Sequence, residues 1–525
     1  MIEDIQNAIE LAQDGQYDEA EKLYSKLLLE SPDDSILLSS AGLFYSSVKN
    51  YEKAGELLQK AWALNKTLGT ASAFGFIEFE QQNYENAVIA FENALEYGES
   101  PSIYDKLITC LFILKNYNRA VQYAYKMYEL YPDNSSAILN MVKAFIYSGK
   151  LAEAEQLCVT TLRKKSDISS LWFELGFLKE LIYSDDKQAK ECYKIASKLG
   201  NPSADYNIAV SSQKLGEYDE AEKHYKKMLE KFPNDVDTKT SLGMLYLKQK
   251  KFREGYDLFY KRSSRNVSKM TSNMWQPGEK LDEEIIIICD QGFGDHIQFI
   301  RYLPFLKNKK IKVAAPQALR KLFELNYKDF EFIKYEEIDP AVQSIRVSDL
   351  AYVLDMDFSN IPYSEGYLDA ESAQISNQKL KVGLCWEAGG SGIRTMINRT
   401  INIKCFEPFF NLENIQIYSF QVQDTLEGNK KYPEMINLTS GFNDFYDTAC
   451  ALKSMDVIIS VDTAVAHLAG ALGVKTYLLL PYFSDWRWFN DTKHTPWYKS
   501  VEIFQQKDPI SWEEPFNNIM EKLKN

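Results

Sequence analysis

The sequence lacks paired cysteines, long apolar runs and an excess of positive charge, and each absence excludes a class of protein. Its seven cysteines are scattered, odd in number and without a Cys-x-x-Cys pair, which predicts reduced thiols rather than a disulfide framework. No apolar run approaches the length of about 18 residues that a membrane helix requires, so we expect no membrane span. The net charge of -14 argues against nucleic acid as a general partner.

The N-terminal segment MIEDIQNAIELAQDG lacks the basic start and apolar core of a signal peptide, since it is acidic and amphipathic. Together with the reduced thiols, this predicts a cytoplasmic protein. A chain of 525 residues has room for roughly two to four structural units.

A repeat of about 34 residues runs through the first half of the chain. Segments such as GQYDEAEKLY, QNYENAVIAF and GEYDEAEKHY recur, and the small residue that they share returns after 34, 33, 33, 34, 35, 32 and 34 residues. This is the period of the tetratricopeptide helical hairpin, so residues 1–262 are predicted to form about eight such repeats. The aligned small residues are Ala20, Ala54, Ala87, Ala120, Ala154, Ala189, Ala221 and Gly255.

The residue types around this position also fit paired helices. A small side chain is needed where two helices approach closely, and the aromatic residue four positions later, such as Tyr24 or Phe91, is expected to fill the next hairpin. Glycines are expected at the tight crossing of the first helices, and prolines after the second helices. These residues are Gly42, Gly75 and Gly243, and Pro32, Pro132 and Pro233.

Stacked hairpins form a curved surface that typically binds an extended peptide or a protein, so we expect a protein or peptide partner on the array. Four asparagines could contact the backbone of such a partner, although the pattern fits turn and surface positions better. They are Asn83, Asn116, Asn140 and Asn207.

The second half of the sequence predicts α/β structure. The polar segment 263–280 contains Pro and Gly and is expected to form a joint. Beyond it, short β-branched runs alternate with helical patterns, which is typical of parallel sheets with crossover helices. We therefore expect two Rossmann-like lobes, residues 281–379 and 380–525, with a ligand between them at the carboxyl ends of the strands. The predicted strands are Glu284–Cys289, Ile311–Ala315, Leu350–Leu354, Leu380–Trp386, Ile415–Phe420, Val457–Val461 and Lys475–Leu480.

The first motif that carries chemistry is IIIICDQGFGDHIQFIRYLP, residues 285–304. A buried strand leads into a turn with Gly292 and Gly294, where a ligand can approach the backbone, and a helix is expected from about Asp295. Asp295 is placed to act as a general base. It is equally a favoured helix cap, and the spacing alone favours the cap.

The second motif is MDVIISVDTAVAHLAGALGVKTYLLLP, residues 455–481. A strand ends at Val461, and Asp462 and Thr463 open a helix of small residues. Free N–H groups at such a helix start can hold a diphosphate, with the Thr463 hydroxyl as a further donor. The alternative is an ordinary capped crossover helix.

Four motifs in order resemble those of the glycosyltransferases related to bacterial heptosyltransferases, in the branch with N-terminal tetratricopeptide repeats. They are GFGDHIQFIRYLP, VGLCWEAGG, SVDTAVAHLAGALGVKTYLLLPYFSDWRWF and TPWYKSVEIFQQ, and the resemblance covers the array and nearly all of residues 280–515. It implies a GT-B fold and an inverting, metal-independent transfer of a sugar from a nucleotide-sugar donor to an acceptor hydroxyl. No cofactor is implied, and the acceptor could be Ser or Thr of a docked protein.

The resemblance also assigns roles to individual residues. Asp295 would take the proton from the acceptor hydroxyl, and Asp462 would contact sugar or ribose hydroxyls. The leaving diphosphate would be held by the helix start, and the donor site would include the turn glycines and a histidine that faces the cleft. These donor-site residues are Gly292, Gly294, Thr463, Ala464, Val465 and His467.

A metal-free transferase must neutralise the diphosphate with its own groups, and arginine suits phosphate well. Arg399 matches the basic residue of the family; Arg394 is a second candidate, and Arg487 a weaker one. The segment 387–392, Glu-Ala-Gly-Gly-Ser-Gly, departs from the family's Gly-Asn-Pro turn with its following His and Asn-Asp. This departure leaves the donor, its contacts and the activity open.

Two further patterns have competing interpretations. Trp486 and Trp488 could stack on a base or sugar, or could pack beneath their loop. Asp355-x-Asp357 matches the metal motif of the other glycosyltransferase fold, but the two-lobe pattern and the four ordered motifs argue against a metal site.

The sequence therefore favours a glycosyltransferase whose repeats select a protein acceptor. The alternative is a non-enzymatic repeat scaffold with a degenerate transferase domain, and a third interpretation changes only the acceptor, to a glycan or lipid. The helical tail near Trp512–Leu523 is expected to cross back to the first lobe.

Overall fold

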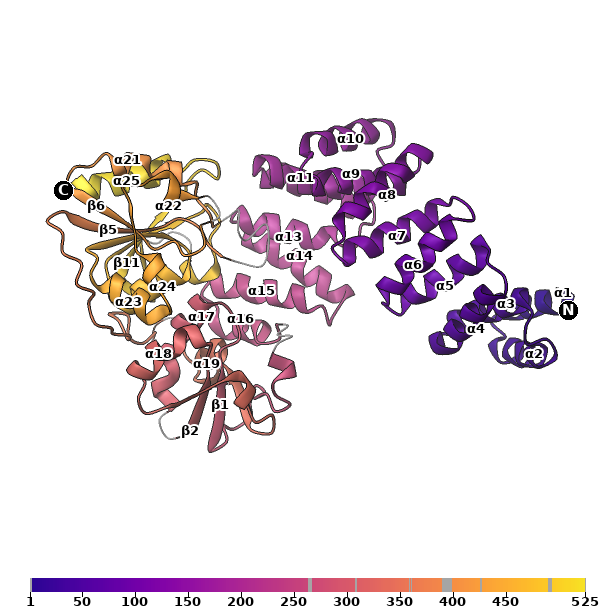
Figure 1. Cartoon of the computed structure of the whole chain (residues 1–525), viewed down its shortest axis with the longest axis horizontal. Coiled ribbons are helices and arrows are strands. Elements are labelled where there is room, and N and C mark those ends of the chain that lie inside the picture. Colours follow the sequence, from indigo (N-terminus) through magenta and orange to yellow (C-terminus); the bar gives the residue numbers. More distant parts are fainter. Residues whose placement is uncertain are drawn as a thin grey trace. The chain divides into compact units, whose positions relative to one another are not determined.

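The computed structural model describes residues 2–262, 267–306, 309–357, 359, 361–389, 399–424, 427–489 and 493–524. The chain divides into two compact units, Met1–Ala204 and Asp205–Asn525 (Figure 1). Arg394 and residues 390–392 of the unusual turn lie outside the described residues.

Residues 2–262, which are described without a gap, fold into sixteen helices that pair into hairpins. The predicted array of about eight tetratricopeptide-type hairpins is thereby confirmed. Six hairpins, α1 to α12, belong to the first unit, and α13 to α16 belong to the second apart from Ala204. The helices are α1 (Ile2–Gln13), α2 (Tyr17–Glu30), α3 (Ser35–Ser47), α4 (Tyr51–Leu64), α5 (Leu68–Glu80), α6 (Tyr84–Leu95), α7 (Pro101–Ile113), α8 (Tyr117–Leu130), α9 (Ser135–Tyr147), α10 (Leu151–Lys164), α11 (Ser169–Tyr183), α12 (Asp186–Lys198), α13 (Ala204–Lys214), α14 (Tyr218–Lys231), α15 (Val236–Lys248) and α16 (Phe252–Phe259).

Small residues occupy the closest helix contacts, as the repeat pattern predicts. The seven aligned alanines are fully buried. A Cβ on Gly75 would lie 2.7 Å from the ring of Phe91. This differs from the expectation in one respect: Phe91 fills the groove over the glycine of its own hairpin rather than of the next one.

The helix ends follow local chemistry. Pro32 comes directly after α2, and the Asp34 side chain then accepts hydrogen bonds from the N–H groups of Ile36 and Leu37 to cap α3. Asn134 and Asp235 cap α9 and α15 in the same way. A proline that ends one helix and an acid or amide that starts the next make the turns short.

The first sheet of the α/β part is parallel, and its four described strands lie in the order β3-β2-β1-β4. The segment after the repeats runs beside its edge, because Trp275 N–H donates to the carbonyl of Ser344 in β4. The elements are β1 (Glu284–Ile288), α17 (Phe293–Phe299), η2 (Ile300–Leu306), β2 (Lys310–Ala314), α18 (Gln317–Asn326), β3 (Glu331–Ile333), β4 (Gln343–Arg346), η4 (Val347–Asp349) and α19 (Leu350–Val353).

The second sheet has its described strands in the order β10-β11-β9-β8-β5-β6-β7, parallel except for the β10–β11 pair. The second half is thus α/β, as expected. The elements are β5 (Leu380–Cys385), η6 (Ile403–Phe406), α21 (Glu407–Phe410), β6 (Ile415–Ser419), α22 (Gly428–Lys431), β7 (Ile436–Asn437), η7 (Thr439–Gly441), α23 (Phe445–Lys453), β8 (Val457–Val461), α24 (Ala464–Ala471), β9 (Thr476–Leu480), η8 (Trp486–Trp488), β10 (His494–Thr495), β11 (Tyr498–Gln505) and α25 (Glu513–Lys524).

Two expectations about this half are wrong. Leu350–Leu354 is not a strand, because the short helix α19 occupies it and the strand lies upstream as β4. Periodicity does not separate a buried strand from a buried helical turn in so short an apolar run. The tail helix α25 does not cross back to the first sheet. It packs on the second, where the ring of Phe516 lies 4.8 Å from that of Phe406.

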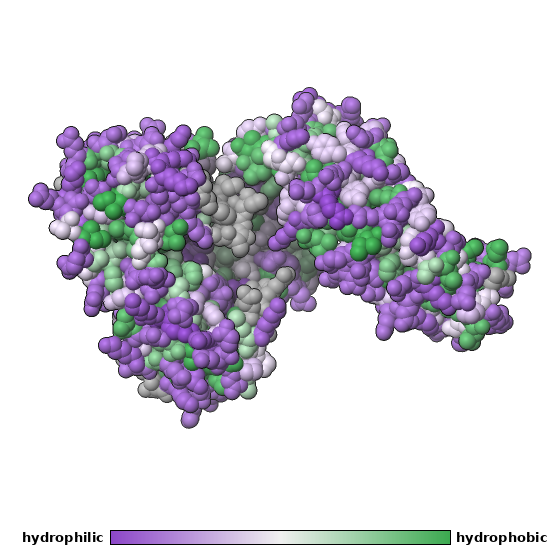
Figure 2. Space-filling view, viewed as in Figure 1, coloured by the Kyte–Doolittle hydropathy of each residue, from purple (hydrophilic) through white to green (hydrophobic). Residues whose placement is uncertain are grey.

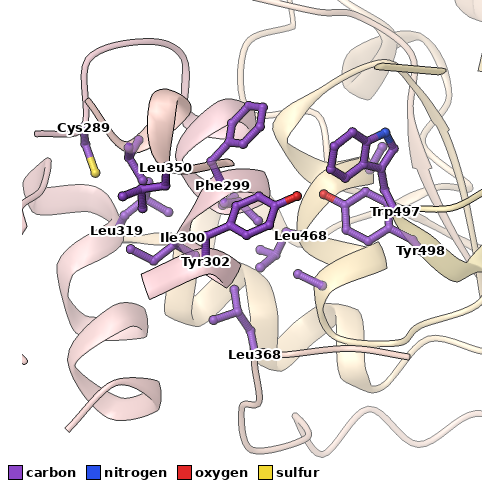
Figure 3. Packing of buried hydrophobic residues seen from close by; sticks show 14 of the residues in the cluster. Cys289, Phe299, Ile300, Tyr302, Leu319, Leu350, Leu368, Leu468, Trp497 and Tyr498 are labelled. Carbon is purple, nitrogen blue, oxygen red and sulfur yellow. The ribbon is translucent and has the colours of Figure 1, made fainter. Parts of the chain in front are cut away.

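One hydrophobic core joins both sheets to the last repeat hairpin. Phe299 and Tyr302, which follow β1, face Leu468 of α24 and the Trp497–Tyr498 pair at the start of β11 (Figure 3). In the face seen in Figure 2, the surface is mostly hydrophilic with scattered apolar patches. Among the described residues, no helix is long and apolar enough to cross a membrane.

Candidate functional site

The candidate site lies at the point in each sheet where the order of strand addition along the chain reverses. In the first sheet, chain order reverses between β1 and β4, and in the second between β5 and β8. Such switch points leave a crevice at the carboxyl ends of the strands. A cavity of about 580 Å³ opens there, and all ten predicted site residues line it. They are Gly292, Gly294, Asp295, Arg399, Asp462, Thr463, Ala464, Val465, His467 and Arg487.

Asp295 lies in the first turn of α17, which begins two residues earlier than predicted, at Phe293. Its Oδ2 accepts a hydrogen bond from the N–H of Gly292 (3.2 Å), so the capping interpretation describes a real contact. Its Oδ1 pairs with the guanidinium of Arg487. Each carboxylate oxygen keeps a second lone pair, so a hydroxyl in the cavity could still donate to Asp295.

Gly294 marks the closest approach of the two site helices. A Cβ there would lie 2.8 Å from Cδ2 of His467 in α24 and 3.6 Å from Cα of Ala464. His467 cannot easily yield, because its Nδ1 lies 3.0 Å from the Tyr498 hydroxyl and its ring stacks on Trp488 at 5.0 Å. Gly294 is therefore needed for helix packing, whatever it does for a ligand.

The start of α24 forms another wall of the cavity. Thr463 is the N-cap residue, but no side chain hydrogen bond caps this end within the described part of the chain. The Thr463 hydroxyl instead lies 3.1 Å from that of Ser460. The first N–H groups of α24 are thus left without a side-chain acceptor beside the cavity, which suits an anion.

Acids and arginines alternate across the cavity. Arg399 Nε lies 3.4 Å from Oδ2 of Asp462, and Arg399 Nη2 lies 3.6 Å from Oδ2 of Asp485. Arg487 Nη1 donates to Asp485 Oδ1 (2.8 Å), and Arg487 Nη2 pairs with Asp295. We call this series Asp462–Arg399–Asp485–Arg487–Asp295 the acid–arginine chain. These ion pairs hold both arginines beside the start of α24.

Two carboxylates of this chain, Asp462 and Asp485, have lowered pKa values. Burial opposes the charge of Asp462, but Arg399 and His467 outweigh it and hold the pKa of Asp462 well below its usual range. Burial likewise opposes the charge of Asp485, whose pKa is nevertheless lowered by Arg487 and Arg399. The Arg487 Nε is buried without a hydrogen-bond partner in the described structure, so this arginine retains a donor beyond its two acid contacts.

The described part of the unusual turn, residues 387–389, and the preceding Trp386 are held by Gln421, which follows β6. The Gln421 Oε1 accepts from the N–H groups of Trp386 (3.0 Å) and Glu387 (2.8 Å). Its Nε2 donates back to the Glu387 carbonyl at 3.0 Å. One buried amide therefore holds the backbone at the start of this turn.

Several competing interpretations can now be separated. Trp486 and Trp488 are buried, so the prediction that they pack beneath their loop is the one that fits. Asp355 pairs with Arg253, and Asp357 accepts from the N–H of Ser359, neither of them beside the cavity. In the described ranges no group of three or more His, Cys, Asp or Glu is arranged to hold a metal ion.

Sequence reasoning missed the apolar half of the cavity, and it did not identify three of the cavity acids, Glu387, Asp444 and Asp485, as site residues. The role of Asp485 comes from its ion pairs with Arg399 and Arg487, which no local motif predicts. The apolar wall comes partly from loops and partly from the first residues of α17 and α23. Its lining includes Phe293, Phe420, Val422, Phe442 and Phe445.

Three of the four asparagines of the repeats lie at turn or packing positions. Asn83 and Asn116 precede α6 and α8 as N-cap residues. Asn140 is buried, and its amide donates to Asp105 Oδ1 at 3.0 Å. The interpretation as turn and packing residues therefore holds for these three.

The sixteen N-terminal helices thus form a tetratricopeptide-type array, which is followed by an α/β part. A tetratricopeptide family model, that of the anaphase-promoting complex, cyclosome, subunit 3, matches residues 13–94. Among curated proteins, the chain is 22% identical to Protein FlbA of Caulobacter vibrioides over 319 residues, which cover 52% of each chain. It is 25% identical to the BBSome complex member BBS4 of Bos taurus over 221 residues, covering 41% of this chain and 42% of the relative.

A third relative, the anaphase-promoting complex subunit CDC16 of Saccharomyces cerevisiae, is 21% identical over 53% of this chain and 35% of its own length. The chain spans about half or less of the length of these relatives. Among solved structures, a tetratricopeptide repeat protein from Parabacteroides merdae has a TM-score of 0.42 at 15% identity, covering 46% of this chain and 97% of its own.

Proposed function

We propose that the chain transfers a sugar from a nucleotide-sugar donor to an acceptor hydroxyl. The observation that carries the proposal is the convergence of two switch-point turns, the uncapped start of α24 and the acid–arginine chain on one cavity. Two sheets that meet at the carboxyl ends of their strands are compatible with a GT-B fold, in which a donor lies in the cleft.

The residues suggest how the transfer would work. The N–H groups of Ala464 and Val465 and the guanidinium of Arg487, which line the cavity, would hold the diphosphate as charge develops on it. Asp295, already ionically paired and facing the cavity, would accept the proton of the attacking hydroxyl. Arg399 would neutralise part of the negative charge on the leaving diphosphate.

The repeats suggest a protein acceptor. Two of the relatives are named as members of protein assemblies, the BBSome complex and the anaphase-promoting complex. A solenoid presents a long surface on which a partner can dock, and docking would raise the local concentration of its Ser or Thr hydroxyls.

A second candidate is a repeat scaffold whose α/β part does no chemistry. The acid–arginine chain favours it, because three carboxylates already compensate the two arginines that a diphosphate would need. In that case the cavity would bind no nucleotide, and the repeats would supply the whole function.

A nucleotide screen separates the two candidates. UDP, ADP, GDP and CMP are each tested for a thermal shift on the full chain. A ligand at 100 times its Kd should stabilise the protein by about 2.7 kcal/mol. Asp295→Asn and Arg399→Ala are compared with Asp355→Asn, whose carboxylate is exposed and outside the cavity.

Arg399→Ala should weaken nucleotide binding at least ten-fold, because it removes a charged phosphate contact. Asp295→Asn should leave nucleotide binding measurable but abolish sugar transfer, and Asp355→Asn should change neither. If no nucleotide binds the wild-type chain, or if both cavity variants transfer sugar normally, the proposed transfer is wrong and the scaffold candidate stands.

A further inference from the structure

The last repeat hairpin reaches the candidate site through one buried lysine. Lys248 is the final residue of α15, and only 4% of it is exposed. Its Nζ donates to the Ser484 carbonyl (2.6 Å), to the Ser484 hydroxyl (3.3 Å) and to the Asp485 carbonyl (3.3 Å). All of the donors of this ammonium group thus have acceptors on two successive residues of the loop after β9.

This loop carries two members of the acid–arginine chain, Asp485 and Arg487. Aromatic contacts hold it from the same hairpin, because Trp486 packs edge-on against Tyr256 (6.4 Å) and Phe259 (6.2 Å) of α16. The position of Arg487 over the cavity is therefore set by the eighth repeat as well as by the second sheet.

The ammonium group lies in an unusual environment. A buried lysine is costly unless it is paired, yet the contacts of Lys248 are neutral oxygens. Burial lowers its pKa to about 8, against the attraction of Asp485 and Asp462. The other charged groups near this contact are Arg487 on the loop and Lys250, which lies over the ring of Phe489.

We propose that Lys248 is a positioning residue that ties the repeat array to the donor site by holding the Ser484–Arg487 loop. This inference rests on the proposed function. It predicts that a change in the last hairpin alters donor binding through Arg487, although Lys248 itself touches no substrate. The repeats would then do more than dock an acceptor, since they would also complete the site in which the donor lies.

The test compares Lys248→Met with Lys251→Met in the full chain. Lys251 is a neighbouring lysine on the same hairpin that is half-exposed and 3.8 Å from Glu222. Circular dichroism checks that both variants are folded. The affinity for the nucleotide that binds best among UDP, ADP, GDP and CMP is then measured from pH 7 to 9, a range that lies above the last phosphate ionisation, at about pH 6, and below the ionisation of the uracil and guanine bases.

We expect Lys248→Met to weaken nucleotide binding at least five-fold at pH 7 and Lys251→Met to leave it unchanged. Wild-type affinity should fall as the pH rises through about 8, because Lys248 then loses its charge, and Lys248→Met should lack this fall. Wild-type binding that is independent of pH over this range overturns the inference even if Lys248→Met does not fold. Equal binding by Lys248→Met and wild type overturns it too, whereas a wild type that binds no nucleotide overturns the proposed function on which it rests.

Discussion

Gly294→Ala is expected to destabilise the second unit and to disturb the candidate site at once. The new methyl group would lie 2.8 Å from Cδ2 of His467, more than half an ångström inside ordinary contact. His467 is 5% exposed and is held by Tyr498 and Trp488, so its ring has nowhere to move. Overpacking of this kind costs about 1–3 kcal/mol. Helix propensity returns up to about 1 kcal/mol, and even with this full return the net loss reaches about 2 kcal/mol.

Gly292→Ala is the matched control, two residues away in the same turn. Its φ of -73° suits alanine, and the new Cβ would meet only Asp295 Oδ2 at 3.4 Å. A poorer N-cap costs about 0.5–1 kcal/mol, and the loss of unfolded-state freedom returns about the same, so its stability should match wild type.

Urea unfolding followed by tryptophan fluorescence measures both variants, since six of the eight tryptophans follow the repeats, and the buried Trp488 and Trp497 report on the α/β part. The reasoning is refuted if Gly294→Ala unfolds at the wild-type midpoint, or if Gly292→Ala loses as much stability. A nucleotide that binds the cavity should bind Gly294→Ala more weakly and Gly292→Ala with little change.

Three further predictions concern stability. Asp462→Asn should cost about 2 kcal/mol at neutral pH by removing the charged partner of Arg399. Because the folded-state pKa of Asp462 is depressed, its contribution is present above about pH 4 and is lost on acidification, so urea midpoints from pH 2 to 5 should fall less steeply in the variant. Burial lowers the pKa of His296 to about 4. The free energy of unfolding of the wild type should therefore fall by up to about 3 kcal/mol between pH 6.5 and 4, because the unfolded state takes up a proton first. The His296→Gln variant should not show this fall. In the first unit, Gly55→Ala should raise the thermal midpoint, since its Cβ meets nothing closer than 3.7 Å, whereas Gly176→Ala should lower it because a buried tyrosine ring lies 2.7 Å away.

The repeat array was predictable because its signal recurs eight times and rests on side-chain size. The fully buried alanines at this position satisfy a steric need that only a few residue types meet. The strands were less predictable. Val457–Val461 is bounded as expected, but the run at Leu350 looks the same in sequence and forms a helical turn.

The candidate site was likewise predictable only in part. Asp295 and Asp462 were found because each follows a buried strand within its own motif. Asp485 and Lys248 were not, because their importance arises from contacts between segments far apart, and Lys248 is 237 residues before Asp485. Local patterns predict turns at strand ends, whereas partners from another element are defined only by the fold.

The core that joins the two sheets limits how this part of the molecule can move. Arg301, in η2, donates to the carbonyl of Trp497 at 2.9 Å and lies 4.8 Å from the ring of Tyr498, and it is fully buried. Rotation of one sheet against the other would expose this arginine to solvent and break its contact with the Tyr498 ring. We therefore expect the loops around the cavity to open and close it, because loops can shift without unpacking a core. The rate at which a ligand enters or leaves would then be set by loop motion rather than by a hinge between two rigid bodies.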